Sequence, residues 1–420
     1  MTTKAITAVI FLVALVTAMA LVGCKEGPAG PKGDDGQDLF GGSLEGFAAG
    51  IKCGTCHIPE TDTTYFVLAR SYQWAQSKHA VGGDLERNGG NCAGCHTTEG
   101  FMQMMKSVTG PATIQAVSDK WQPSPPGCFA CHSAHQRGDF SLRIQTPVTV
   151  TSYVTGVADQ TFDYGKGNLC VRCHQTRTTF PMSPKPDPTK TAATDTITIT
   201  SSRWYPHYGV QGQMLMGTGG FQFSGATFTG NSAHSNSATI KANGCPTCHM
   251  AEQVYSSTGG FPTNAGTGKG GGHTMNVKYH WPDASSPESQ GLTGCKDAAC
   301  HGSAFSSFDY KGVTTSPLNL GTTTAVKRYL DTLQTLLLDT AIVNKFNAGA
   351  KKAWIAIRAT DSSVTVNAGS GANALKIRPA SRAGALFNFL FIEHDRSHGA
   401  HNTKYTVELL KASIAELRKP

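Results

Sequence analysis

Twelve of the 13 cysteines in this 420-residue sequence occur as pairs, and a histidine directly follows the second cysteine of every pair. Two residues separate the cysteines in five pairs, and four residues separate them in the last pair. The pairs are Cys53 and Cys56, Cys92 and Cys95, Cys128 and Cys131, Cys170 and Cys173, Cys245 and Cys248, and Cys295 and Cys300. The histidines that follow them are His57, His96, His132, His174, His249 and His301.

The sequence Cys-x-x-Cys-His is the attachment signature of c-type haem. Its two thiols add to the vinyl groups of one porphyrin, and its histidine becomes the proximal ligand of the iron. Structural zinc and disulfides also use paired cysteines, but neither requires a histidine after every second cysteine. We therefore predict six covalently bound haem c groups. The twelve motif cysteines would form the thioether bonds, and the six motif histidines would be the proximal ligands.

Each iron also needs a ligand on its other face, and nine of the 15 histidines lie outside the motifs. Six of the nine would complete bis-histidine coordination. We favour six as distal ligands from their positions between motifs, after a glycine run, or at the start of the last predicted helix. These six are His79, His135, His207, His234, His273 and His401. His394 and His398 are alternatives to His401, and His280 is the weakest candidate.

The composition predicts little conventional core, since only 39% of residues are hydrophobic and the chain has 47 Gly and 20 Pro. A chain rich in loops has difficulty offsetting its conformational entropy. We expect a mainly α fold with long irregular loops and little β-structure, in which six packed haems form the core. The formal net charge is +8. The haem propionates would bring it close to neutral, so we expect no nucleic-acid partner.

Several segments have the periodicity of regular structure. Residues 65–80 and 325–343 predict helices, and two more helices are expected over 382–397 and 403–417, the last with Asn402 as its N-cap. Residues 196–200 alternate Thr and Ile and predict a strand, and residues 358–381 predict a loop or short hairpin.

The N-terminus predicts export and lipid anchoring. Residues 1–23 form a signal peptide that ends in the lipobox Leu-Val-Gly before Cys24, the cysteine outside the haem motifs. Lys25, rather than Asp, follows Cys24 and favours the outer membrane. Residues 24–45 would be the lipidated cysteine and a collagen-like tether. Residues 46–301 would form the hexahaem domain, and residues 302–420 a helical region that packs back on the haems.

With these motifs the chain resembles the multihaem cytochromes c of anaerobic, metal-reducing bacteria. The segment from Asp395 to Tyr405 is similar to the D-x-S-x-G-x-H-N-x-x-Y ending of multihaem cytochromes related to the pentahaem nitrite reductases, which implies that His401 ligates a haem. The spacing of Cys295 and Cys300 is similar to variant sites in small tetrahaem cytochromes. The lipobox and stem look like those of outer-surface lipoprotein cytochromes. The nitrite reductases carry a C-x-x-C-K site that leaves the catalytic iron open, and no such site occurs in this sequence.

These features favour an electron carrier at the outer membrane, on the cell surface or alternatively on the periplasmic face. Its partners would be other periplasmic or outer-membrane redox proteins and a terminal acceptor such as a metal oxide. One alternative is a reductase of nitrite, hydroxylamine or a sulfur oxyanion that uses one open haem. Another is a subunit of a cytochrome filament.

Overall fold

A computed structural model describes residues 67–81, 85–90, 92–106, 123–133, 140–177, 182–251, 270–280, 284–311 and 319–420. Of these residues, 39% are helical and 9% lie in strands. The signal peptide, Cys24, the tether, the first motif (Cys53, Cys56 and His57) and His135 lie outside the described residues.

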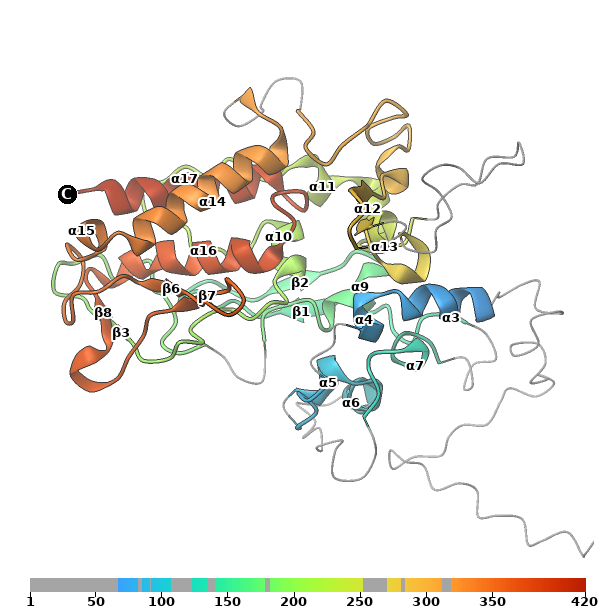
Figure 1. Cartoon of the computed structure of the whole chain (residues 1–420), viewed down its shortest axis with the longest axis horizontal. Helices are drawn as coiled ribbons and strands as arrows, with labels where there is room; N and C mark the ends of the chain where they lie inside the picture. The colour runs from blue at the N-terminus through green and yellow to red at the C-terminus, as the bar shows by residue number, and fades with distance from the viewer. Residues whose placement is uncertain are drawn as a thin grey trace, which may run out of the picture.

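Three long helices near the C-terminus form one end of the elongated molecule (Figure 1). They are α14 (Thr322–Leu338), α16 (Ala383–Asp395) and α17 (Thr403–Arg418). Every residue of α16 except Glu393 is buried, as expected for a helix that is apolar on all sides. The Asn402 side chain accepts a hydrogen bond from the Tyr405 amide, which confirms the predicted N-cap of α17. The helix predicted over 325–343 is interrupted at Asp339, which caps the separate helix α15 (Thr340–Val343).

Residues from the middle of the chain complete this core. The predicted strand over 196–200 is β3 (Ile197–Ile199), and it pairs antiparallel with β8 (Leu375–Ile377). Trp204, Met214 and Phe221 are buried in the same hydrophobic cluster as α14, α16 and α17. The segment around 197–221 therefore packs with the C-terminal region. A hydrophobic protein core exists here that the low apolar content did not predict.

Three further two-stranded antiparallel sheets occur among the described residues. They pair β1 (Val148–Val150) with β2 (Gln160–Phe162), β4 (Lys278–His280) with β5 (Glu288–Gln290), and β6 (Ile355–Ile357) with β7 (Val364–Val366). β7 lies in the segment 358–381 that was predicted as a loop or short hairpin, but its partner β6 precedes that segment. The C-terminal region also contains the 3-10 turns η5 (Gly371–Asn373) and η6 (Ala380–Arg382).

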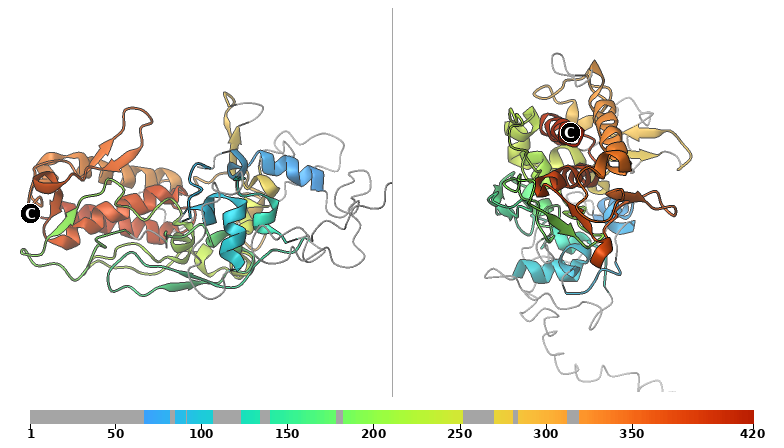
Figure 2. Two further views of the ribbon diagram at one scale, coloured as in Figure 1. Left: turned by 90° about the horizontal axis from the view of Figure 1, so that it is seen from below. Right: turned by 90° about the vertical axis from the view of Figure 1, so that its left-hand side faces the viewer.

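Short helices around the motifs form the other end of the molecule (Figures 1 and 2). The motif cysteines and histidines lie on or beside α5 (Ala93–His96), α7 (Cys128–Cys131), α9 (Gly167–Val171), α13 (Pro246–His249) and η3 (Thr293–Cys295). The other short elements are α3 (Val67–Ala75), α4 (Lys78–Val81), α6 (Thr98–Lys106), α10 (Gln211–Met216), α11 (Ala233–Asn236), α12 (Ala238–Asn243) and η2 (Gly272–Thr274). In the second, third and fifth motifs, the two cysteines lie on or directly beside one short helix, which brings them to one side of the backbone. No helix among the described residues has the length and apolar character needed to span a bilayer.

Candidate haem-binding site

One connected cavity of ≈ 2700 Å³ runs through the motif region. A pocket for a single small ligand usually measures about 300–1,000 Å³, so this cavity is several times larger. Every described motif cysteine except Cys300 lines it, as do all five described motif histidines. The other histidines in its wall are His79, His207, His234, His273, His398 and His401.

The histidines of this cavity lie in facing pairs. Each pair joins one motif histidine to one histidine that we predicted as a distal ligand. The ring centres are 6.1 Å apart for His174 and His79, 6.3 Å for His96 and His207, 6.3 Å for His132 and His273, 6.3 Å for His249 and His401, and 6.0 Å for His301 and His234. An imidazole nitrogen lies about 2 Å from a metal that it ligates, which puts two rings on opposite sides of that metal roughly 6 Å apart, centre to centre. All five pairs therefore have a spacing that fits an iron between two axial imidazoles.

The outer ring nitrogens of several histidines have hydrogen-bond acceptors of their own. The Nδ1 atom of His174 lies 3.1 Å from Oε1 of Gln211, and that of His249 lies 3.0 Å from the carbonyl oxygen of Met275. The Nδ1 atom of His234 lies 2.6 Å from the carbonyl oxygen of Ala400. A histidine that donates from Nδ1 keeps the lone pair on Nε2, and metal-ligating histidines are typically held in this way.

Three more histidines have Nδ1 contacts of different kinds. His132 has a longer contact of 3.4 Å to the carbonyl oxygen of Ser141. The Nδ1 atom of His79 lies 3.0 Å from the sulfur of Met275. His401 has a carboxylate partner instead, because its Nδ1 donates to Oδ1 of Asp395 over 2.7 Å. The charge that surrounds the predicted ligands therefore varies from one pair to the next.

Burial keeps most of these imidazoles neutral, which is the form that binds a metal. It lowers the pKa of His79, His249 and His273 to about 4, with further contributions from neighbouring histidines and, for His273, from Arg70. It also lowers the pKa of His174, His234 and His301. His401 is different. Burial alone would lower its pKa, but the charge and hydrogen bond of Asp395 outweigh that effect and raise it.

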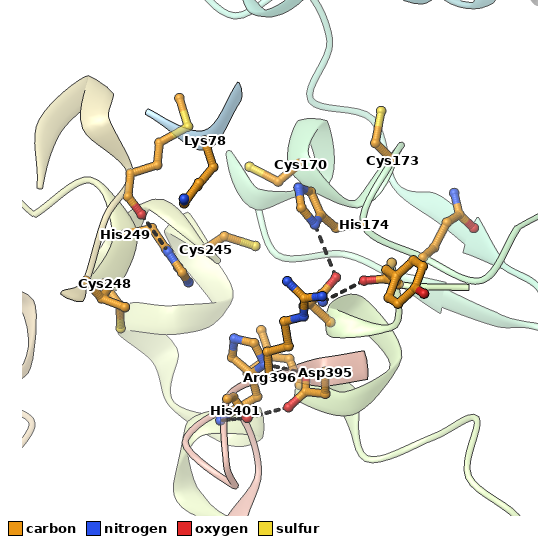
Figure 3. A pocket seen from close by; sticks show the side chains of 18 of the residues that line it. Lys78, Cys170, Cys173, His174, Cys245, Cys248, His249, Asp395, Arg396 and His401 are labelled. Atoms are coloured by element: carbon orange, nitrogen blue, oxygen red, sulfur yellow. Dashed lines mark hydrogen bonds and ion pairs between the residues drawn. The ribbon is translucent and has the colours of Figure 1, made fainter. Parts of the chain in front are cut away.

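Four of the motifs lie against one another through glycine and backbone contacts. A Cβ atom added to Gly167 would lie 3.0 Å from the amide nitrogen of Cys245, and one added to Gly294 would lie 3.1 Å from the Cα of Cys248. The sulfur of Cys173 is 3.8 Å from the carbonyl oxygen of Gly94. The second, fourth, fifth and sixth motifs therefore form a row of neighbouring motifs. Figure 3 shows the middle of this row, with His174, His249 and His401 around one part of the cavity.

The motif thiols of neighbouring sites also interact. Cys95 interacts with Cys173, Cys170 with Cys245, and Cys248 with Cys295. Within each pair the interaction raises the pKa of one thiol and lowers that of the other, so the pKa is raised at Cys173, Cys170 and Cys248 and lowered at Cys95, Cys245 and Cys295. The ten described motif cysteines form no disulfide with one another. The raised pKa keeps the thiols of Cys170, Cys173 and Cys248 protonated at neutral pH.

Among the described residues, three histidines are not members of these pairs, and one motif cysteine does not line the cavity. His280 is exposed, and its Nδ1 lies 2.6 Å from the carbonyl oxygen of Ser286. His394 is buried beside Tyr208, with ring centres 4.3 Å apart, and His398 lines the cavity. His401, rather than either of these, lies opposite His249. Cys300 is exposed and lies outside the cavity lining.

Sequence reasoning missed the acceptors that orient the rings. Asp395, Gln211 and the backbone carbonyls of Met275 and Ala400 carry no sequence signal for this role, because they lie between six and 166 residues from the histidines they contact. Met275 contacts predicted ligands of two different pairs, His79 through its sulfur and His249 through its carbonyl oxygen.

Among the described residues, no group of three or more His, Cys, Asp and Glu side chains could hold a metal ion by itself. No protein-family model, curated protein or solved structure matches this chain.

Proposed function

We propose that the chain is a multihaem c-type cytochrome that carries electrons and binds six haem c groups covalently. This proposal rests on the arrangement of the histidines. Each of the five described motif histidines faces a second histidine at 6.0–6.3 Å between ring centres, and each of those partners comes from outside the motifs. Five such pairs around one large cavity are the arrangement that several bis-histidine haems require.

The residue roles follow from these pairs. In each described motif the two cysteines would form the thioether bonds and the motif histidine would bind the iron from one side. His79, His207, His234, His273 and His401 would bind from the other side. When bound, the haems would supply reversible one-electron transfer. His57 and His135 lie outside the described residues, and the proposal extends the same pairing to them.

The double ligation supports a carrier rather than a reductase. A reductase that binds nitrite, hydroxylamine or a sulfur oxyanion at iron needs an axial position without a protein ligand. In each described pair, the two histidines would occupy both axial positions of the iron. Electron transfer through the edge of a porphyrin needs no free axial position. The histidine pairs therefore favour the carrier.

The location belongs to the same proposal and rests on the N-terminal sequence. A lipidated Cys24 would tether the protein to the outer membrane, on the cell surface or on the periplasmic face. There the protein would accept electrons from periplasmic or outer-membrane cytochromes and pass them to an extracellular acceptor such as a metal oxide.

Four measurements on the purified protein test the proposal. Intact mass of the mature chain should equal the polypeptide plus six haems, and electron paramagnetic resonance of the oxidised protein should show low-spin iron throughout. Carbon monoxide should then bind negligibly to the reduced protein, and soluble ferric chelates should reoxidise it rapidly. A chain without covalent haem would disprove the cofactor assignment. Stoichiometric carbon monoxide binding with sustained nitrite turnover would disprove the carrier.

A further inference from the structure

The predicted axial ligands differ in the charge of the group that accepts the hydrogen bond from their Nδ1 atom. His174, His234 and His249 have neutral acceptors, which are the Gln211 side chain and two backbone carbonyl groups. His401 instead donates to the Asp395 carboxylate over 2.7 Å. A carboxylate makes the imidazole a stronger electron donor than a neutral oxygen does, because it shares the Nδ1 proton more strongly.

Asp395 is held firmly in this position. It is the last residue of α16, and its side chain is only 1% exposed. The hydroxyl group of Ser397 donates a hydrogen bond to its second oxygen, and the same hydroxyl accepts from the backbone amide of His401. The seven residues from Asp395 to His401 therefore contain the predicted ligand, the carboxylate and the residue that orients the carboxylate. Burial strengthens this ionic hydrogen bond, since little water competes for it.

Gln211 provides an internal comparison at the neighbouring site. Its side-chain oxygen lies 3.1 Å from Nδ1 of His174, and its side-chain nitrogen donates to the carbonyl oxygen of His394, next to Asp395. The two sites thus have side-chain acceptors of similar shape, one neutral and one anionic. His174 and His249 belong to adjacent motifs in the row, where Gly167 contacts Cys245.

We propose that Asp395 is a tuning residue that lowers the reduction potential of the haem held between His249 and His401, relative to the haem held between His174 and His79. The inference rests on the proposed function. Negative charge on the axial ligand stabilises the ferric iron, which carries one more positive charge than the ferrous iron. Asp395 does not bind the iron, and it acts only through His401.

The test uses the full-length holoprotein with two nearly isosteric substitutions. Asp395→Asn removes the charge but can keep both hydrogen bonds, since its amide oxygen can accept from His401 and its amide nitrogen can donate to Ser397. Gln211→Glu introduces the opposite change beside His174. Potentials are measured by spectroelectrochemical titration. Comparison with His401→Ala identifies the transition of the haem that His401 binds.

We expect Asp395→Asn to make reduction of that single haem about tenfold more favourable, which is ~59 mV for a one-electron couple. Gln211→Glu should shift the neighbouring haem in the opposite direction. Haem content and the low-spin signal of both variants serve as controls for ligand loss. If the Asp395→Asn protein loses His401 as an iron ligand, the Ser397→Ala variant is used in its place. That variant leaves the carboxylate with more of its charge and should lower the same potential.

The outcomes separate this inference from the proposed function. A protein without six low-spin haems would contradict the function before any titration. A protein with six low-spin haems whose potentials do not change in Asp395→Asn would overturn the role of Asp395 alone. A shift of equal size in all haems would also overturn it, because the inference predicts an effect at one site.

Discussion

The carbonyl oxygen of Met275 accepts the Nδ1 hydrogen bond of His249 over 3.0 Å. The sulfur of the same methionine lies 3.0 Å from Nδ1 of His79, the predicted distal ligand opposite His174. Met275 has a φ of 56° and follows η2, which contains His273. A single tight turn thus contacts three of the predicted haem sites.

Met275→Leu should separate these contacts. The substitution removes the sulfur beside His79 but keeps the backbone carbonyl that faces His249. Because leucine has nearly the volume of methionine, the stability loss should stay below about 1.5 kcal/mol. We expect the electron paramagnetic resonance signal of the haem at His79 to shift while that at His249 remains. A shift at both sites, or at neither, would contradict separate roles for the sulfur and the carbonyl.

His401→Ala should convert one low-spin haem to high-spin and leave the others unchanged. The ring of His401 lies opposite His249 at 6.3 Å, and alanine leaves that iron without its distal ligand. His280→Ala is the matched control, because His280 is exposed and lies outside the cavity lining. The spectrum of the His280→Ala protein should therefore equal that of the native protein. An unchanged spectrum in His401→Ala would transfer the role to His398, which also lines the cavity.

Gly294→Ala should disturb the contact between the fifth and sixth motifs. An added Cβ atom would lie 2.3 Å from the carbonyl oxygen of Thr247, so the two backbones would have to move apart. We expect a loss of about 1–3 kcal/mol in stability, seen as a lower unfolding midpoint, and weaker haem occupancy at the sixth motif. Gly89→Ala is the control, since an added Cβ atom there would meet nothing within 4 Å. Equal midpoints for the two variants would argue against close contact between these motifs.

Cys24→Ala should release the protein from the membrane with its haems still attached. The tether over 24–45 carries few apolar residues, so the acyl chains would provide the attachment. Cell fractionation followed by haem staining measures this. A variant that stays in the membrane fraction after washing with salt would indicate that a partner protein holds it there.

The sequence by itself determined the features that depend on neighbouring residues. Two thiols and an imidazole within five to seven residues predict each attachment site, because a short stretch of chain can present all three. The helices near residues 325, 383 and 403 could also be predicted, since their apolar periodicity and the Asn402 cap are local. The six distal candidates could be named, and five of them lie opposite a motif histidine. The sixth, His135, lies outside the described residues.

Only the tertiary structure decided which histidines face each other. His79 lies opposite His174, far along the chain, rather than opposite a histidine of the nearest motif. The tertiary structure likewise joined β3 to β8. Such pairings bring together segments that are distant in sequence, and they arise when apolar side chains such as Trp204 and Phe387 are buried in one core. Spacing along the chain carries no information about these contacts, because they depend on how the whole chain packs.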